Sequence, residues 1–423
     1  MTNHVRPASG LRTARNGTLI IGGGFGGAHV ARLLGKAGAT IVNPDASMLY
    51  TPMLPEVAAG AIEPRHVVVP LRQMCPHAEL LRGRVVALDE GARRVKVETE
   101  TGSVEVEYER LVVALGSTAR LVPIPGLAEK AFTFKTVADA VRLRNHVLHR
   151  LELADADPAN AQRYLTFVFV GAGYAGVEVL AELRQLVEDM WRHYPQLHAG
   201  ATARWVLVDG APKILAEVPG RLGDDAARQL VRDGVEIRRS TTVRVVEPDA
   251  VVLSDGTRLE TDTLVWTAGV VTAPVVGRLG LPLDDRGRIR VEPTLRVEGR
   301  EDVWALGDCA AVPNAATPGR VDPPTCQHAL RQARRLAKVL RGKPKPYSYR
   351  SLGQGATLGR LKGIARVGGA EVRGVLGSVV VRWYHLSQVP QLSRALRVMA
   401  DSLISMVFGR DFVELSEGGG VVR

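Results

Sequence analysis

Residues 18–43 read TLIIGGGFGGAHVARLLGKAGATIVN, and this stretch decides the predicted fold. An apolar run, a glycine turn, a helical stretch and a second apolar run follow one another, as in the strand–helix–strand unit of a parallel sheet. Gly22 permits the bend, Gly24 lets backbone approach a pyrophosphate, and Gly27 lets the helix pack on the strand. Phe25 opens the helix, whose N-terminus faces the phosphate charge. The stretch predicts a dinucleotide-binding domain with these four residues at the nucleotide.

A second stretch repeats the pattern farther along the chain. Residues 166–186 read TFVFVGAGYAGVEVLAELRQL, and the second strand of this unit, ARWVLVD, follows at 203–209. Its glycine turn consists of Gly171, Gly173 and Gly176. The two turns lie too far apart to share one sheet, so the sequence predicts two separate dinucleotide-binding domains. The simplest pairing places FAD in the first domain and NADH in the second, because a flavin accepts hydride and passes electrons on.

The residue that ends the second strand of each unit bears on which nucleotide is bound. An acid at this position bonds the ribose hydroxyls of the nucleotide. In the second unit this residue is Asp209, which would also repel a 2′-phosphate and therefore predicts NADH rather than NADPH. In the first unit it is Asn43, whose side-chain amide still bonds a hydroxyl, and Asp45 is an alternative two residues later.

The layout of the chain is duplicated. Short alternating stretches that read as antiparallel connector strands follow each glycine unit and lead into another buried strand. The sequence therefore predicts an α/β fold of two Rossmann-like dinucleotide-binding domains and a C-terminal region. The expected boundaries are 17–125 and 276–346 for the two parts of the FAD domain, 126–275 for the NADH domain, and 347–423 for the C-terminal region.

Charge is distributed unevenly along the 423 residues. The net charge is +11, but Pro323 to Ala400 alone contain 15 Lys and Arg against one acid, so the rest of the chain is slightly acidic. No nucleic-acid recognition module is evident, and the basic region predicts an anionic membrane surface as partner. The three cysteines show no metal-ligand or CxxC spacing. We expect no metal and no thiol relay, and we expect neither a signal peptide nor a spanning helix.

The last part of the basic region predicts an amphipathic helix. Apolar residues recur there at helical spacing, at Leu392, Leu396, Met399, Leu403 and Val407. A basic, amphipathic segment is typical of a helix that lies in the membrane interface. Two alternatives are open: contact with a second copy in a homodimer, or packing of the helix on the core.

Several motifs make the chain resemble the type II NADH dehydrogenases, or NADH:quinone oxidoreductases, from about residue 17 to 415. The segment 45–60, which contains Pro52, is similar to the family's segment beside the flavin. GluArgLeuValValAlaLeuGly, ending at Gly116, and TrpThrAlaGlyVal, containing Gly269, resemble its two strand-end motifs. LeuGlyAspCysAla resembles the motif whose aspartate, here Asp308, bonds the ribityl chain of the flavin.

A further motif resembles the quinone site of the same family. In ProProThrCysGlnHisAlaLeuArgGln, at 323–332, Gln327 and Ala329 match, Cys326 stands where alanine is usual, and the last glutamine is shifted to Gln332. The segments 349–360 and 383–386 are similar to the region that docks on the membrane.

The resemblance implies that NADH reduces FAD and that the electrons pass to menaquinone or ubiquinone, with Gln327 at the acceptor. It also implies a peripheral protein at the cytoplasmic face of the cell membrane that pumps no protons. Glu178 and Glu182 lie four residues apart on one predicted helix face, where the family carries acids. They could relay a proton or orient the nicotinamide, or they could be purely structural.

Three other functions share some of these features. A soluble NADH-dependent reductase of a small redox protein would not need the C-terminal apolar stripe. A sulfide:quinone oxidoreductase would need two cysteines near the flavin, and Cys309 and Cys326 are well separated in sequence. A redox-sensing protein that holds FAD and NADH would need no quinone site.

Overall fold

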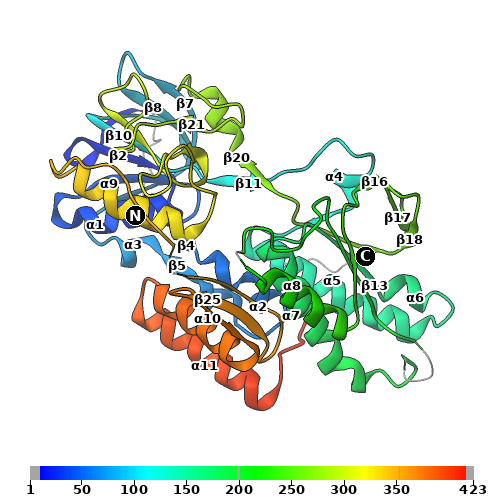
Figure 1. The fold of residues 1–423 in the computed structure, drawn as a ribbon. Helices are drawn as coiled ribbons and strands as arrows, with labels where there is room; N and C mark the ends of the chain where they lie inside the picture. The colour runs from blue at the N-terminus through cyan, green and yellow to red at the C-terminus, as the bar shows by residue number, and fades with distance from the viewer. Residues whose placement is uncertain (1–9, 198–200, 219, 352, 416–423) are drawn as a thin grey trace, which may run out of the picture. The chain divides into compact units, whose positions relative to one another are not determined.

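The structure is a computed structural model that describes residues 10–197, 201–218, 220–351 and 353–415. The chain divides into two compact units, each built from three separate stretches (Figure 1). The first unit contains residues 1–50, 68–118 and 270–350, and the second contains 51–67, 119–269 and 351–423. Each unit has its own parallel sheet, which confirms the predicted α/β fold.

The first unit is organised around a five-stranded parallel sheet. Its strand order is β22 (Val303–Ala305), β10 (Arg110–Val113), β2 (Thr18–Ile21), β3 (Thr40–Asn43) and β6 (Glu79–Arg82). The side chains of β2 are all buried, as expected for a strand covered on both faces. Two helices, α1 (Phe25–Leu34) and α9 (Cys326–Val339), pack against each other in this unit. Because neighbouring strands are parallel, their carboxyl ends meet at one edge, where ligands of open α/β sheets bind.

A second, four-stranded sheet completes most of the first unit. Its order is β1 (Gly10–Thr13), β9 (Gly102–Glu107), β8 (Arg94–Thr99) and β7 (Arg84–Asp89). The last three strands are antiparallel and alternate between buried valines and exposed charged residues. These are the connector strands that the alternating pattern predicts.

The second unit repeats the parallel sheet of the first. Its order is β12 (Phe132–Thr133), β19 (Thr263–Trp266), β13 (Thr166–Val170), β14 (Arg204–Val208) and β15 (Val235–Arg238). The rings of Phe167 and Trp205 stack across the β13–β14 pair with centroids 4.5 Å apart. Full burial of such side chains stabilises the fold by about 1.5–3 kcal/mol each. The connector strands β16 (Val243–Val246), β17 (Ala250–Leu253) and β18 (Arg258–Glu260) form an antiparallel sheet.

Helices carry the remaining functional positions of the second unit. The long helix α7 (Tyr174–Met190) packs against the short helix α2 (Leu54–Ala58), which in turn contacts α5 (Val137–Ala156). Residues 51–67 therefore group with this unit, although they follow the first glycine unit in sequence. The shorter helices are α4 (Leu127–Lys130), α6 (Ala161–Tyr164) and α8 (Leu222–Arg232).

The C-terminal region is part of the second unit. Strands β24 (Gly353–Thr357), β25 (Gly363–Val367) and β26 (Ala370–Arg373) form an antiparallel sheet against which α10 (Gly374–Gln388) packs. The predicted amphipathic helix is α11 (Leu392–Phe408). Among the described residues, no helix combines the length and the apolar character that crossing a membrane requires.

Candidate functional site

The glycine turn of the first unit is closed on one side and open on the other. Gly22 has φ 105°, a value that favours glycine, and a Cβ added to it would meet the Ala114 carbonyl oxygen at 2.2 Å. A Cβ on Gly27 would lie 1.9 Å from the Gly22 carbonyl oxygen, so the helix packs too closely on the turn for any side chain. Gly24, by contrast, is exposed and would have nothing within 4 Å of an added Cβ.

The glycine turn of the second unit has the same geometry. A Cβ on Gly176 would lie 1.9 Å from the Gly171 carbonyl oxygen and 2.6 Å from Thr267 Oγ1. Gly173 is exposed and again has nothing within 4 Å of an added Cβ. In each turn, the outer glycines are needed for packing, and the middle one leaves space that a ligand can enter.

The helices that follow these turns begin at a glycine, which has no side chain to cap them. Gly24 caps α1 and Gly173 caps α7, both without a side-chain hydrogen bond, and neither first turn contains an acid. The first backbone N–H groups of a helix have no partner within the helix and carry partial positive charge. An uncapped N-terminus beside open space fits a pyrophosphate, so the residues of both turns fit a dinucleotide.

Asn43 and Asp209 make equivalent hydrogen bonds to the glycine turns of the two units. Asn43 Oδ1 accepts a hydrogen bond of 2.8 Å from the backbone nitrogen of Gly23, and Asn43 Nδ2 donates to the carbonyl oxygen of Asp45. Asp209 Oδ2 accepts from the backbone nitrogen of Ala172, and its Oδ1 accepts from that of Ala211 at 2.7 Å. Each side chain therefore pins the peptide after the first glycine of its turn. Asn43 replaces the acid in this role without loss of the bond.

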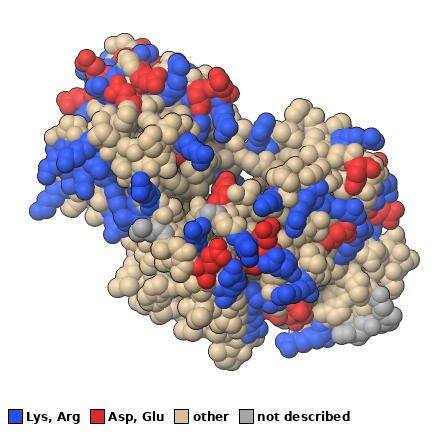
Figure 2. All heavy atoms as spheres, in the orientation of Figure 1, with Lys and Arg blue, Asp and Glu red and all other residues tan. Residues whose placement is uncertain are grey.

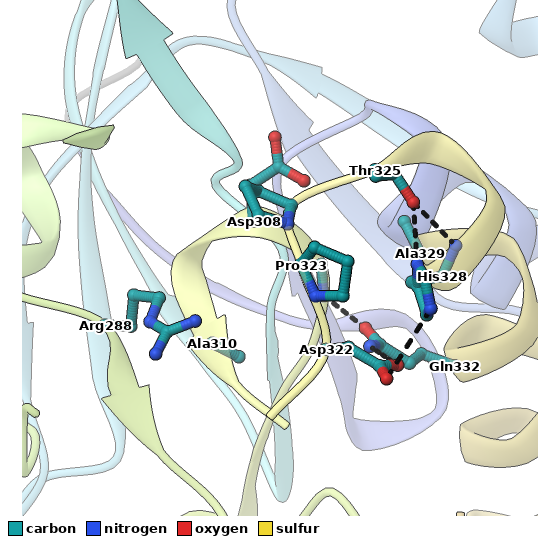
Figure 3. A pocket seen from close by; sticks show the side chains of 11 residues that line it. Arg288, Asp308, Ala310, Asp322, Pro323, Thr325, His328, Ala329 and Gln332 are labelled. Atoms are coloured by element: carbon teal, nitrogen blue, oxygen red, sulfur yellow. Dashed lines mark hydrogen bonds and ion pairs between the residues drawn. The ribbon is translucent and has the colours of Figure 1, made fainter. Parts of the chain in front are cut away.

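The turn that contains Asp308 is held from two directions in the first unit. Ser117 Oγ donates to Asp308 Oδ2 at 2.6 Å, directly beside Gly116. The buried side chain of Gln332, on α9, accepts from the Gly307 nitrogen at 2.8 Å and donates to Asp322 Oδ2 at 3.0 Å (Figure 3). These bonds fix the peptide that precedes Asp308.

A small, partly open pocket lies at this turn. Figure 3 shows Asp308, Asp322, His328 and Gln332 among the residues that line it. Burial lowers the pKa of His328 although Asp322, 3.6 Å from its Nε2, opposes this effect. His328 is therefore a neutral hydrogen-bonding residue near pH 7, and its Nδ1 lies 2.7 Å from Thr325 Oγ1.

Gln327 and Gln332 have different surroundings although both belong to the predicted quinone motif. Gln332 is buried, and both ends of its amide are used within the first unit. Gln327 is half-buried near the start of α9, and its Oε1 accepts a bond of 3.3 Å from Tyr349 Oη. This bond directs the carbonyl end of the Gln327 amide toward the tyrosine.

The structure gathers the predicted site residues into two groups. In the first unit, the carboxyl ends of β2, β3 and β10, the Asp308 turn and α9 carry Gly22, Gly24, Phe25, Gly27, Asn43, Gly116, Asp308 and Gln327. The second unit carries Gly171, Gly173, Gly176, Glu178, Glu182, Asp209 and Gly269. Pro52 lies in a 3₁₀ turn, Thr51–Met53, and groups with the second unit.

Glu178 and Glu182 are both buried on α7, and they differ in charge. Burial raises the pKa of Glu178 to about 8, although its carboxylate accepts a bond of 2.9 Å from the Thr357 nitrogen. Burial acts in the same direction on Glu182, but Arg410 and Arg382 outweigh it and lower the pKa of Glu182. Arg382 Nη2 lies 3.1 Å from Glu182 Oε1, and Arg410 donates to the other oxygen.

Sequence reasoning missed three members of this arrangement: Glu56, Arg382 and Arg410. Glu56 is buried on α2, next to α7. One signal could have identified it, because it is a lone acid within an apolar run, LeuProGluValAlaAla. No such signal marks the two arginines among the many basic residues of the C-terminal region.

No disulfide joins the three cysteines. Burial raises the pKa of the Cys309 thiol, beside Asp308, to about 11, and that of Cys75 to about 11. Both are protonated near pH 7 and are poor nucleophiles. No cluster of His, Cys, Asp and Glu suited to a metal ion occurs in the part of the chain that the structure describes.

Comparison with known proteins shows a consistent set of relatives. Residues 17–333 match the family described as pyridine nucleotide-disulphide oxidoreductase. The chain is 30% identical over 397 residues to the type II NADH:quinone oxidoreductase Ndh of Mycobacterium tuberculosis, covering 88% of this chain and 84% of that protein. It is 28% identical over 411 residues to a probable NADH dehydrogenase of Dictyostelium discoideum, covering 93% and 90% of the two chains.

Solved structures share the fold at lower identity. NDH2 from Plasmodium falciparum in complex with NADH is similar with a TM-score of 0.86 at 16% identity, and the match covers 96% of this chain and 100% of that chain. A NAD-dependent persulfide reductase from A. fulgidus is similar with a TM-score of 0.66 at 18% identity, covering 84% and 63% of the two chains.

Substitution of the tightly packed Gly176 and of the open Gly173 should affect different properties, stability in the first case and nucleotide binding in the second. Gly176→Ala should lower the apparent unfolding midpoint by about 2–10 °C, because overpacking costs about 1–3 kcal/mol. Gly173→Ala adds the same methyl group to open space at a φ of −76°, so the unfolding midpoint should stay unchanged. Gly173→Ala should instead reduce the stabilisation that added NADH provides, measured by thermal shift. Equal midpoints for the two variants would contradict the packing described for this turn.

Proposed function

Since the chain belongs to the type II NADH:quinone oxidoreductases, within the pyridine nucleotide-disulphide oxidoreductase family, we propose that it oxidises NADH and passes the electrons through FAD to a membrane quinone without pumping protons. The observation that carries the proposal is the pair of uncapped helix N-termini, one in each unit, each beside an open glycine. One chain therefore offers two dinucleotide sites, as transfer between NADH and FAD requires.

In this proposal the first unit holds FAD. The N-terminus of α1 and the open face of Gly24 would hold the pyrophosphate, and Asp308, fixed by Ser117, would accept bonds from ribityl hydroxyls. When bound, FAD supplies a two-electron acceptor for hydride and a donor to quinone. The buried bond between Gln332 and the Gly307 nitrogen holds the turn that carries Asp308.

The second unit holds NADH in this proposal. The N-terminus of α7 and Gly173 would hold its pyrophosphate, and Asp209 would accept bonds from the adenosine ribose. Gln327, on the first unit, would donate from its amide nitrogen to a quinone carbonyl oxygen, because Tyr349 already occupies its acceptor end.

The orientation of α11 supports a membrane-bound acceptor. Its polar side faces the second unit: Asp401 Oδ2 accepts from the Glu63 nitrogen at 3.1 Å and lies 2.5 Å from His66 Nδ1, and Arg394 donates to the Arg65 carbonyl oxygen at 2.8 Å. Val398 is the buried apolar residue of this helix. The polar side of this amphipathic helix therefore contacts the protein, and its apolar side is exposed.

Together α10 and α11 expose many apolar side chains, which we name the apolar face. It consists of Val375, Leu376, Val379, Trp383, Leu392, Leu396, Met399, Leu403, Ile404, Met406, Val407 and Phe408. Trp383 is 68% exposed and Phe408 is 82% exposed. Figure 2 shows an uncharged surface where Figure 1 has α11, with Lys and Arg gathered beside it. Large exposed apolar patches mark interaction sites, and basic flanks favour anionic lipid.

We infer that the apolar face lies in one leaflet of the cytoplasmic side of the cell membrane, where a lipid-soluble quinone is available. This arrangement also separates the proposal from its alternatives. A soluble reductase has no use for such a surface, and a sulfide:quinone oxidoreductase needs reactive thiols, whereas Cys309 is buried and protonated. Steady-state turnover with NADH and NADPH and a short-chain quinone, with and without vesicles, tests the function as a whole.

Asp209 should give the enzyme its preference for NADH. A carboxylate about 4 Å from the 2′-phosphate of NADPH costs about 1 kcal/mol in water and more when partly buried. Asp209→Asn should keep a carbonyl acceptor for the glycine turn, as Asn43 does in the first unit, and should reduce the ratio of kcat/KM for NADH over NADPH about tenfold. Asn43→Asp, which acts on the other nucleotide site, is the matched control and should leave this ratio unchanged. An unaltered ratio in Asp209→Asn would exclude Asp209 from the ribose site.

Gln327 should affect only the half-reaction with quinone. Removal of one neutral hydrogen bond costs about 0.5–1.5 kcal/mol, so Gln327→Leu should slow reoxidation by a short-chain quinone about 2- to 10-fold in stopped-flow measurements. Reduction by NADH should proceed at the wild-type rate. Tyr349→Phe removes the bond that orients the amide and should have a smaller effect in the same direction. Equal slowing of both half-reactions would indicate a structural role for Gln327.

Charge on the apolar face should detach the protein from lipid. The double variant Leu396→Glu/Leu403→Glu should lose binding to anionic vesicles in sedimentation and lose turnover with a long-chain quinone, while it keeps turnover with a short-chain one. The control Val231→Glu changes a side chain on α8 that is 57% exposed, close to the 55% of Leu403, and should bind vesicles normally. A double variant that changes from dimer to monomer and still binds vesicles would identify the face as a homodimer contact.

A further inference from the structure

Gln327 and Arg331 lie one helical turn apart on α9, within the first unit. Residues four positions apart share one face of a helix, and both of these side chains are half-buried. Gln332, which the sequence predicts to complete the quinone motif, is buried, and both ends of its amide are bonded inside the unit. The residue that shares a face with Gln327 is therefore Arg331 rather than Gln332.

Tyr349 contacts both of these side chains. Its Oη donates to Gln327 Oε1 at 3.3 Å, and Arg331 Cζ lies over its ring, 5.2 Å from the centroid. The ring of His328 meets the same tyrosine ring edge-on, with centroids 5.6 Å apart. One tyrosine thus positions an amide and a guanidinium beside each other on the same face of α9.

Tyr349 is itself held in place by the buried side chain of Asn314. The Tyr349 nitrogen donates to Asn314 Oδ1 at 3.0 Å, and Asn314 Nδ2 donates to the Tyr349 carbonyl oxygen at 2.8 Å. These two bonds fix the backbone from which the ring projects. The ring is therefore a defined support for the side chain of Arg331.

The buried acid of this group, Asp322, is engaged by two side-chain amides. Its Oδ1 accepts from Asn314 Nδ2 at 2.9 Å, and its Oδ2 accepts from Gln332 Nε2 at 3.0 Å. His328 adds no positive charge near pH 7, because burial lowers its pKa. The positive charge beside Gln327 is therefore that of Arg331.

A guanidinium that rests on a ring keeps its capacity to bind an anion. The contact with the ring is an attraction to its quadrupole and uses none of the five N–H donors of an arginine. These donors lie in one plane and match two neighbouring oxygens that share a negative charge. Gln327 offers only a neutral amide. The two side chains together therefore fit an acceptor that presents a carbonyl oxygen and an anionic oxygen.

We propose that Arg331 determines the specificity for the acceptor, by binding quinones that carry an acidic ring hydroxyl beside a carbonyl group. The inference rests on the proposed function and adds the chemical class of the acceptor. A hydroxyl group on a quinone ring is conjugated with a carbonyl group, so it ionises near pH 7 as a carboxylic acid does. Its oxygen lies next to a carbonyl oxygen, and this pair matches the planar donors of Arg331, while Gln327 donates to a carbonyl oxygen.

Steady-state turnover of the FAD-loaded protein with a matched pair of quinones tests the proposal. Lawsone, a naphthoquinone with one acidic hydroxyl beside a carbonyl, is an anion near pH 7, and its methyl ether is neutral. Arg331→Gln should lower kcat/KM for lawsone about tenfold, because it removes a charge-assisted bond at a half-buried position. The value for the methyl ether should stay within about twofold of the wild type. Comparison of variant with wild type for each quinone cancels the difference in their reduction potentials.

Three further variants separate the contact from its surroundings. Arg331→Lys keeps the charge without the planar donors and should retain part of the preference for lawsone. Tyr349→Phe keeps the ring beneath Arg331 and should retain the preference, although it removes the bond to Gln327. Arg334→Gln removes the same charge from an exposed position of α9 and should leave the ratio of the two kcat/KM values unchanged.

Each outcome decides for or against the role of Arg331. An unchanged ratio in Arg331→Gln, or an equal fall with both quinones, would overturn the proposal while the proposed function stands. A loss of preference in Arg334→Gln as large as that in Arg331→Gln would assign the effect to the general charge of α9 and would also overturn it. A wild-type protein that reduces neither quinone with NADH would instead refute the proposed function, and with it this inference.

Discussion

Both parallel sheets depend on one steric constraint, the contact of a helical glycine with the carbonyl oxygen of the turn before it. Gly27 and Gly176 each leave 1.9 Å between an added Cβ and that oxygen, so no other residue allows this approach. The contact brings the N-terminus of α1 or α7 to the carboxyl edge of its sheet. Because no side chain caps either helix, the free N–H groups remain directed at the space beside Gly24 or Gly173. Binding of a pyrophosphate in each unit follows from this placement.

A second layer of bonds holds the edges of these sites. Asn43 and Asp209 pin the turns, and Gln332 pins the peptide before Asp308, all through buried or half-buried hydrogen bonds to backbone nitrogen. These bonds are made between groups of the protein itself, so they order the turns as part of the folded structure. An asparagine can replace the acid in the first unit because the bond to the Gly23 nitrogen needs only a carbonyl oxygen as acceptor.

In the C-terminal region, charged side chains of the helices contact the rest of the second unit, and apolar side chains are exposed on the other side. Arg382 and Arg410 turn inward to Glu182, and Asp401 and Arg394 fasten α11 to residues 63–66. The apolar face is left outward because the polar side is occupied. One region therefore provides both the outward apolar face and the two arginines that pair with Glu182.

The two parallel sheets, the glycine turns and the amphipathic helix could be predicted from sequence, because each of them depends on a local period or spacing. A strand of buried residues, a turn at GxGxxG and a stripe at helical spacing all depend on neighbours within a few residues. The position of Asn43 as the counterpart of Asp209 was also readable, since both end the strand that follows their helix.

Only the tertiary structure decided which way α11 turns, where residues 51–67 belong, and which of the buried acids is paired. Periodicity predicts an apolar side but not whether that side faces the core or the solvent, and here long-range bonds from Asp401 to Glu63 and His66 settle the direction. Glu182 and Arg410 are far apart in sequence and meet only through the path of the chain after α11. The charge of a carboxyl group depends on partners at that distance, so no local pattern reveals it.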